Sequence, residues 1–167
     1  MTIVVDVANV MGSRPDGWWR DRAGAAVRLH AQIAQLAASG RATLPEDLPE
    51  ARPDDRPDDR PGEDEPDGDT PGFVLVLEGA ARAAMPRLGA ADAGPVQTGP
   101  PRPGEVRVVA ACGSGDDEIV AVVRALPGRR VVVTADRELR ARCAAAGAEI
   151  LGPGWLLGLL PAASRGD

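Results

Sequence analysis

The chain has 167 residues and a formal net charge of −6, with 25 acids, 19 arginines, no lysine, no tyrosine and one histidine. This length suits one ordinary domain with a substantial core. Without lysine, the chain cannot be a P-loop nucleotidase or a Schiff-base enzyme, because both use a lysine amine. One histidine cannot build a His-rich zinc site, and two cysteines without CxxC spacing exclude a zinc ribbon or a disulfide scaffold.

The beginning of the chain, MTIVVDVANV, lacks the basic start of a secretory signal and reaches an aspartate at its sixth position. Its apolar runs are far shorter than the roughly 18 residues that cross a membrane. Two thiols outside a disulfide pattern are typical of a reducing compartment. We therefore expect a cytoplasmic protein without a membrane span.

The negative charge is concentrated in residues 43–72, which contain seven prolines, twelve acids and three arginines, a net charge of −9. Such a segment cannot bury enough apolar surface to offset its ordering entropy, and we interpret it as a disordered acidic insert. The rest of the chain carries sixteen arginines and thirteen acids, a net charge of +3. A second segment, 86–104, is rich in proline and glycine and predicts a flexible connection.

Strand-like and helix-like patterns alternate along the rest of the chain. Short β-branched runs without polar alternation predict strands buried on both faces, at 3–5, 73–77, 106–111, 131–133 and, more weakly, 148–151. Helical patterns between them cover 17–39, 116–126, 136–146 and 155–160, and helix-ending glycines are expected at Gly40, Gly128 and Gly147. This alternation predicts one three-layer α/β domain over 1–160, with a mostly parallel sheet of about five strands and a tail at 161–167.

Acidic residues stand where these strands end. Asp6 and Glu78 follow the first two strands, the segment GSGDD at 113–117 follows the third, and Asp136 follows the fourth. Ligands of parallel sheets bind outside the carboxyl ends of the strands, near the point where strand order reverses. Carboxylates gathered there repel one another unless cations or protons neutralise them. Oxygen ligands without clustered His or Cys favour Mg²⁺ or Mn²⁺.

Five motifs in order carry a family resemblance: DVAN at 6–9, GSRPDGWWRDR at 12–22, EGAAR at 78–82, GSGDDEI at 113–119 and VTADREL at 133–139. Together they resemble the NYN domain group of PIN-like nucleases, in its actinobacterial YacP-like branch. The resemblance covers nearly all of the chain outside the two irregular segments. It implies a PIN-like, Rossmann-like fold with an acidic metal pocket. It also implies divalent-metal-dependent cleavage of RNA, in some relatives in association with the ribosome.

The resemblance also implies roles for single residues. Asp6 matches the first metal-binding acid, and Asn9 matches a neighbour that orients it or touches substrate. Asp116 matches the second acid, with Asp117 a close alternative, and Asp136 matches the third.

Further candidates lie around these acids. Glu78 and Thr134 are additional candidates for the metal site. Because lysine is absent, phosphate contacts fall to arginine, and the candidates are Arg14, Arg20, Arg22, Arg82 and Arg137. Ser114, in the glycine-rich segment before the predicted helix, would offer phosphate a helix start.

The function that we expect is an endoribonuclease in which Asp6, Asp116 and Asp136 hold one or two Mg²⁺ or Mn²⁺ ions. Such ions neutralise the phosphodiester and activate water, and no histidine base is required. Two alternatives stay open: a non-catalytic RNA- or ribosome-binding module of the same fold, and a nucleotide phosphohydrolase. Ala8 and the missing lysine depart from the pattern of haloacid-dehalogenase phosphohydrolases.

Simpler structural roles also stay open for the acids. Asp6 could cap a loop, and Thr134 with Asp136 could form a helix-capping pair. Asp116 and Asp117 suit a helix start because of the helix dipole.

Among the other notable residues, Trp18 and Trp19 suit either core packing or base stacking. His30, Cys112 and Cys143 are predicted to be packed residues.

Overall fold

The computed structural model describes residues 1–46, 48, 70–89 and 99–161. A five-stranded sheet in the order β3-β2-β1-β4-β5 forms its centre, and every neighbouring pair is parallel. The strands are β1 (Thr2–Asp6), β2 (Gly72–Leu77), β3 (Val106–Ala110), β4 (Arg130–Val133) and β5 (Glu149–Leu151). The predicted α/β class is confirmed, and the sheet is parallel throughout the described residues.

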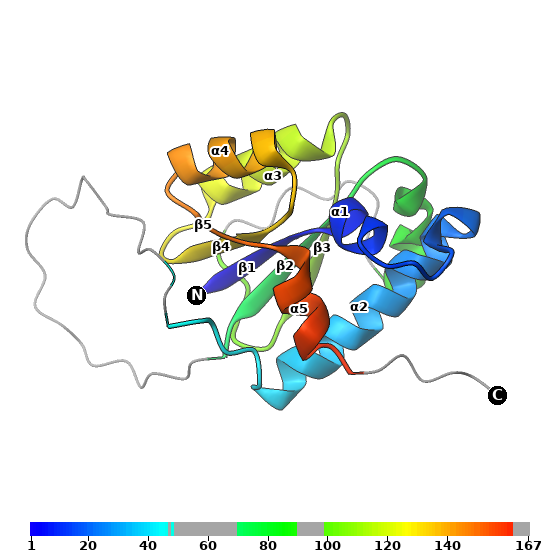
Figure 1. Ribbon diagram of the computed structural model, residues 1–167, viewed down its shortest axis with the longest axis horizontal. Helices are drawn as coiled ribbons and strands as arrows, with labels where there is room; N and C mark the ends of the chain where they lie inside the picture. Colours follow the sequence, from blue (N-terminus) through cyan, green and yellow to red (C-terminus); the bar gives the residue numbers. More distant parts are fainter. Residues whose placement is uncertain (47, 49–69, 90–98, 162–167) are drawn as a thin grey trace, which may run out of the picture.

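Helices cover both faces of this sheet (Figure 1). They are α1 (Val7–Gly12), α2 (Arg22–Ser39), α3 (Gly115–Ala125), α4 (Arg137–Ala145) and α5 (Pro153–Leu159), with 3-10 helices η1 (Trp18–Arg20) and η2 (Gly79–Leu88). Helices α3 and α4 lie on one face, and α1, α2 and α5 lie on the other. No described helix is both long enough and apolar enough to cross a membrane.

The strands lack polar alternation because both of their faces are buried. In β1, Ile3 and Val5 pack into the core under α1, α2 and α5, whereas Val4 packs against α3 and α4. All three side chains are fully buried. Burial on both faces holds β1 in the centre of the sheet, and Asp6 therefore emerges at its carboxyl end.

The strand order reverses beside β1. Strands β2 and β3 lie in succession on one side of β1, whereas β4 and β5 lie in succession on its other side. The carboxyl ends of β1 and β4 are therefore neighbours, which is where ligands of open parallel sheets bind.

Besides η2, which was not predicted, two helical segments differ from the predicted elements. The helix expected over 17–39 is interrupted, because Asp21 separates η1 from α2 and its side chain caps α2 by accepting from Gly24 N at 2.8 Å. Helix α1, which follows β1 directly, was not predicted, since six residues are too few to show a helical period.

The expected helix ends are mostly in place. Gly40 ends α2 in the left-handed region, with φ of 63°. Gly147 comes directly after Ala146, the residue that caps the end of α4. Gly128 instead lies two residues beyond Leu126, the residue that caps α3, and belongs to the following loop.

The two irregular segments are only partly described. Within the acidic insert predicted over 43–72, residue 47 and residues 49–69 lie outside the described residues, and Gly72 already belongs to β2. Within the connection predicted over 86–104, η2 extends to Leu88, and residues 90–98 lie outside the described residues.

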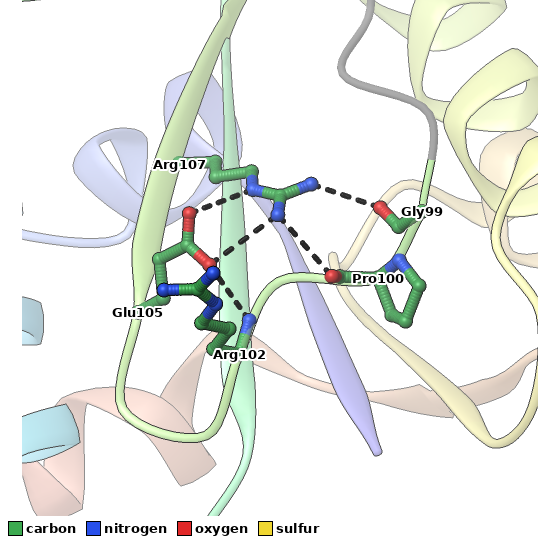
Figure 2. Close-up of polar contacts among 5 residues, drawn as sticks. All are labelled: Gly99, Pro100, Arg102, Glu105 and Arg107. Atoms are coloured by element: carbon green, nitrogen blue, oxygen red, sulfur yellow. Dashed lines mark hydrogen bonds and ion pairs between the residues drawn. The ribbon is translucent and has the colours of Figure 1, made fainter.

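Residues 99–104 are bound to β3 by Arg107 (Figure 2). Its guanidinium donates to the carbonyls of Gly99 at 2.8 Å and Pro100 at 3.2 Å, and its Nε donates to Glu105 Oε1 at 2.8 Å. Glu105 Oε2 accepts from Arg102 N at 2.7 Å. The part of the predicted flexible connection next to β3 therefore has a specific set of bonds.

Gly72 allows this segment to lie against β2. A Cβ on Gly72 would stand 2.6 Å from Pro101 Cγ and 2.8 Å from the carbonyl oxygen of Arg102. We expect Gly72→Ala to lower the free energy of unfolding by about 1–3 kcal/mol, because the segment must move to admit the methyl group. Gly154→Ala is the control: a Cβ on this exposed α5 residue meets open space, and the change should be neutral or stabilising. Equal urea midpoints for both variants would contradict this explanation.

Candidate active site

An open pocket of about 440 Å³ lies at the carboxyl ends of β1 and β4. It brings together four of the predicted acids, from β1, from the end of β2, from α3 and from the start of α4. Its lining consists of Asp6, Ala8, Asn9, Gly12, Ser13, Trp18, Glu78, Asp116, Ala135 and Asp136. The predicted convergence of strand-end acids is therefore present as a shared pocket.

Asp6 forms the floor of this pocket and is only 8% exposed. Its Oδ1 accepts from Asn9 N at 3.1 Å, which caps α1. Its Oδ2 accepts from the hydroxyl of Thr134 at 2.9 Å. Asp6 thus has the capping role that the sequence left open, and it also faces the pocket.

Two hydrogen bonds join the start of α1 to the β4–α4 connection, and a third lies within that connection. Thr134, which is fully buried, donates to Asp6, and its Oγ1 accepts from Asp136 N at 3.1 Å. Asn9 Oδ1 accepts from Ala135 N at 2.8 Å. Asp136 in turn caps α4, its Oδ1 accepting from Leu139 N at 2.8 Å. Asp136 therefore does cap a helix, Thr134 supports it by accepting from its N–H group, and the bonds of Thr134 to Asp6 and of Ala135 to Asn9 hold the two sides of the pocket together.

Glu78 connects the end of β2 to the start of α3. Its Oε2 accepts from Gly115 N at 2.9 Å, and a Cβ on Gly115 would overlap the Glu78 carboxylate. The sequence suggested this helix start as a phosphate site. In the structure a carboxylate of the protein already bonds to its first N–H group, while Ser114 is exposed and makes no side-chain capping bond.

Helix α3 distinguishes the two adjacent aspartates. Asp116 is half-buried and lines the pocket, and its side chain makes no hydrogen bond or ion pair to another described residue. Asp117 is exposed and accepts from Arg142 Nη2 at 2.6 Å, outside the pocket lining. The helix therefore presents Asp116 to the pocket and Asp117 to its surface.

The electrostatics of the pocket disfavour further negative charge. Burial raises the pKa of Asp6, and Asp116 and Glu78 raise it further, although the bonds from Asn9 and Thr134 oppose this. Burial also raises the pKa of Asp116, followed by the charges of Asp136 and Glu78. A bound cation would relieve both effects.

The five candidate arginines do not line this pocket. Arg14 donates to Gln32 Oε1 at 2.9 Å and borders a second pocket, of about 320 Å³. The guanidinium of Arg22 lies 5.4 Å from the ring centroid of Trp18. The other three are exposed on the surface: Arg20, Arg82 and Arg137.

Two of the residues considered for packing, Trp19 and Cys112, are exposed instead. Trp18 is half-buried and packs against the core, but Trp19 is 56% exposed and is no core anchor. Cys112 is exposed because it lies beyond the end of β3, so the prediction that it is packed is wrong. Cys143 is buried as predicted, and burial raises its pKa to about 11, so its thiol stays protonated at neutral pH. His30 is half-buried on α2 as predicted, and burial lowers its pKa.

Sequence reasoning missed the contribution of η1 to the pocket. Trp18 lines the pocket beside Gly12 and Ser13 because α1 ends at Gly12 and the chain turns back into η1. The signal was the pair of tryptophans in the segment 12–22, which the sequence suggested only as core or stacking residues.

No protein-family model matches the chain, and no curated protein matches it either. A solved structure does match. The chain has the same fold as Rae1 (YacP) from Bacillus subtilis. The crystal structure of a point mutant of Rae1 aligns with a TM-score of 0.50 at 13% identity, covering 95% of this chain and 72% of Rae1. YacP is also the name of the branch that the motifs resemble. At this identity the likeness to Rae1 establishes the fold, and the site residues rest on the geometry above.

The donor atoms at this end of the Rae1-like sheet suit a hard divalent cation, since they are carboxylate and amide oxygens. Within the described part of the chain, however, no three Asp, Glu, His or Cys side chains form a group that could hold a metal ion. Existing bonds engage both oxygens of Asp6 and one oxygen each of Glu78 and Asp136. Asp116 retains both of its oxygens. The donor atoms therefore suit Mg²⁺ or Mn²⁺. The acidic side chains would have to move closer to one another before they could bind one ion jointly.

Proposed function

We propose that this protein is a divalent-metal-dependent endoribonuclease that hydrolyses RNA phosphodiester bonds in the acidic pocket. The observation that carries the proposal is the meeting of four carboxylates, from four separate segments, where the strand order reverses. Gathering them costs stability, as the raised pKa values of Asp6 and Asp116 indicate, and such a cost is typical of a chemical site. The motif resemblance to PIN-like nucleases and the fold shared with Rae1 agree with it.

After their side chains move together, Asp116 and the unengaged oxygens of Glu78 and Asp136 would hold Mg²⁺ or Mn²⁺ in the pocket that Asp6 also lines. When bound, the metal supplies charge neutralisation and an activated water. Thr134 donates to Asp6 Oδ2, which holds this carboxyl group in place and lowers its pKa against the larger effect of burial. Glu78 holds the first turn of α3 through Gly115, which places Asp116 at the pocket.

A non-catalytic RNA-binding or ribosome-binding module of the same fold is a second candidate. The observation that favours it is that hydrogen bonds within the protein already engage oxygens of three of the four pocket acids, and among the described residues no three acids form a group that could hold a metal ion. The two candidates differ in whether RNA is cut.

The deciding experiment incubates the full chain with single-stranded RNAs in Mn²⁺, in Mg²⁺ and in EDTA. We expect internal cuts with either metal and intact RNA in EDTA. RNA that is bound but intact under all three conditions would support the binding module instead. Release of phosphate from free nucleotides without RNA cleavage would indicate a phosphohydrolase.

A further inference from the structure

Two adjacent tryptophans connect the acidic pocket to the surface. Trp18 lines the pocket, and Trp19, which is not part of the lining, contacts the Trp18 ring and is 56% exposed. Among the described residues, the other large hydrophobic side chain left exposed is Met1. Two indoles followed directly by Arg20, Asp21 and Arg22 form a much smaller apolar surface than the broad patch that marks a protein interface. An exposed indole of this kind offers one face on which a single planar ring can stack.

The structure holds this pair in a defined arrangement. Trp18 N donates to Asp16 Oδ1 at 3.2 Å, which fixes the start of η1. The two indoles meet edge to face, with ring centroids 6.3 Å apart and planes at 86°. Arg22 packs over the Trp18 ring. Trp18 is thus held by its neighbours, and more than half of the Trp19 surface stays open to a ligand.

We propose that Trp19, supported by Trp18, stacks on an unpaired nucleobase of single-stranded RNA whose backbone enters the acidic pocket. This inference rests on the proposed function, because it takes RNA as the substrate of that pocket. Stacking on an aromatic side chain accepts any base. The exposed guanidiniums of Arg20 and Arg22, on either side of Asp21, supply positive charge for the flanking phosphates. A base inside a duplex has no free face, so the site selects single strands.

The test measures binding of the full chain to a fluorescein-labelled RNA of about 12 nucleotides, single-stranded or paired in a duplex, in Ca²⁺, which neutralises the acidic pocket, and again in EDTA. The readout is fluorescence anisotropy. We expect Trp19→Ala to weaken single-strand binding about tenfold, and Trp19→Phe, which keeps an aromatic face, to weaken it less than about threefold. Duplex binding should be the same for all of these proteins.

Trp155→Phe is the matched control, because Trp155 is half-buried on α5 and does not line the pocket. This variant should bind like the wild type. Unchanged single-strand binding by Trp19→Ala overturns the inference. So does an equal loss of affinity for single strand and duplex in this variant, and so does a wild-type protein that binds no RNA. The nuclease proposal fails separately, through a wild type that binds RNA but does not cut it with Mn²⁺ or Mg²⁺.

Discussion

Replacing Asp116 with asparagine is expected to lower metal-dependent RNA cleavage at least about 100-fold, because a metal ligand contributes several kcal/mol of transition-state stabilisation. Asp116 suits this test better than Asp6, since its side chain bonds to no other described residue and its loss breaks no capping network. The measurement is the initial rate of RNA cleavage in Mn²⁺.

The same substitution should leave the fold at least as stable. The pKa of Asp116 is raised in the folded chain, so its ionised form opposes folding at neutral pH. That cost disappears as the pH falls through the raised pKa. Asp116→Asn should therefore keep or raise the Tm at neutral pH, and Mn²⁺ should raise the Tm of the variant less than that of the wild type.

Asp117→Asn is the matched control on the next residue of the same helix. Asp117 is exposed and pairs with Arg142 away from the pocket. Its loss should change cleavage less than about threefold, since an exposed ion pair contributes about 1 kcal/mol or less. A larger loss for Asp117→Asn than for Asp116→Asn would reverse the assignment of the two aspartates.

Replacing Thr134 with valine is expected to lower the free energy of unfolding by about 2–3 kcal/mol at neutral pH. Valine fills a similar volume but has no hydroxyl. The change therefore leaves Asp6 Oδ2 without its donor and Asp136 N without its acceptor, in a fully buried position. Urea denaturation measures the loss.

The pH dependence identifies the cause of this loss. The bond from Thr134 lowers the pKa of Asp6 against the larger effect of burial, so removing it raises that pKa further. The deficit of Thr134→Val should be greatest above this pKa and should shrink as the pH falls through it, because a protonated Asp6 needs no donor there. Thr134→Ser, which keeps the hydroxyl and loses one methyl group, should cost about 1 kcal/mol at every pH. Equal, pH-independent deficits would show that packing alone is lost.

Most of the fold could be predicted from the sequence. Five apolar runs became five strands, and the four helices expected after them are present with shifted ends. The errors came from short or broken elements. Helix α1 has six residues and η1 has three, too few to show a period, and Asp21 interrupts what looked like one helix.

The acidic residues of the candidate site could be predicted from the sequence, but the hydrogen bonds that they make could not. The position of an acid directly after a strand places it at the carboxyl edge of a parallel sheet, and this brought four of the predicted acids into one pocket. The arginines could not be placed in this way, because long side chains on loops and helix surfaces take their direction from the local packing. Arg14, for example, bonds to Gln32 on α2.

By itself, the sequence determined the class of the fold and the edge of the sheet where the acids gather, because strand burial and strand ends are local patterns. Only the tertiary structure decided that Asp116 rather than Asp117 faces the pocket, that Glu78 occupies the start of α3, and that Trp19 is left exposed. It also paired Asp6 with Thr134, 128 positions away. This pairing depends on β4 returning to lie beside β1, and no local pattern of residues encodes that strand order.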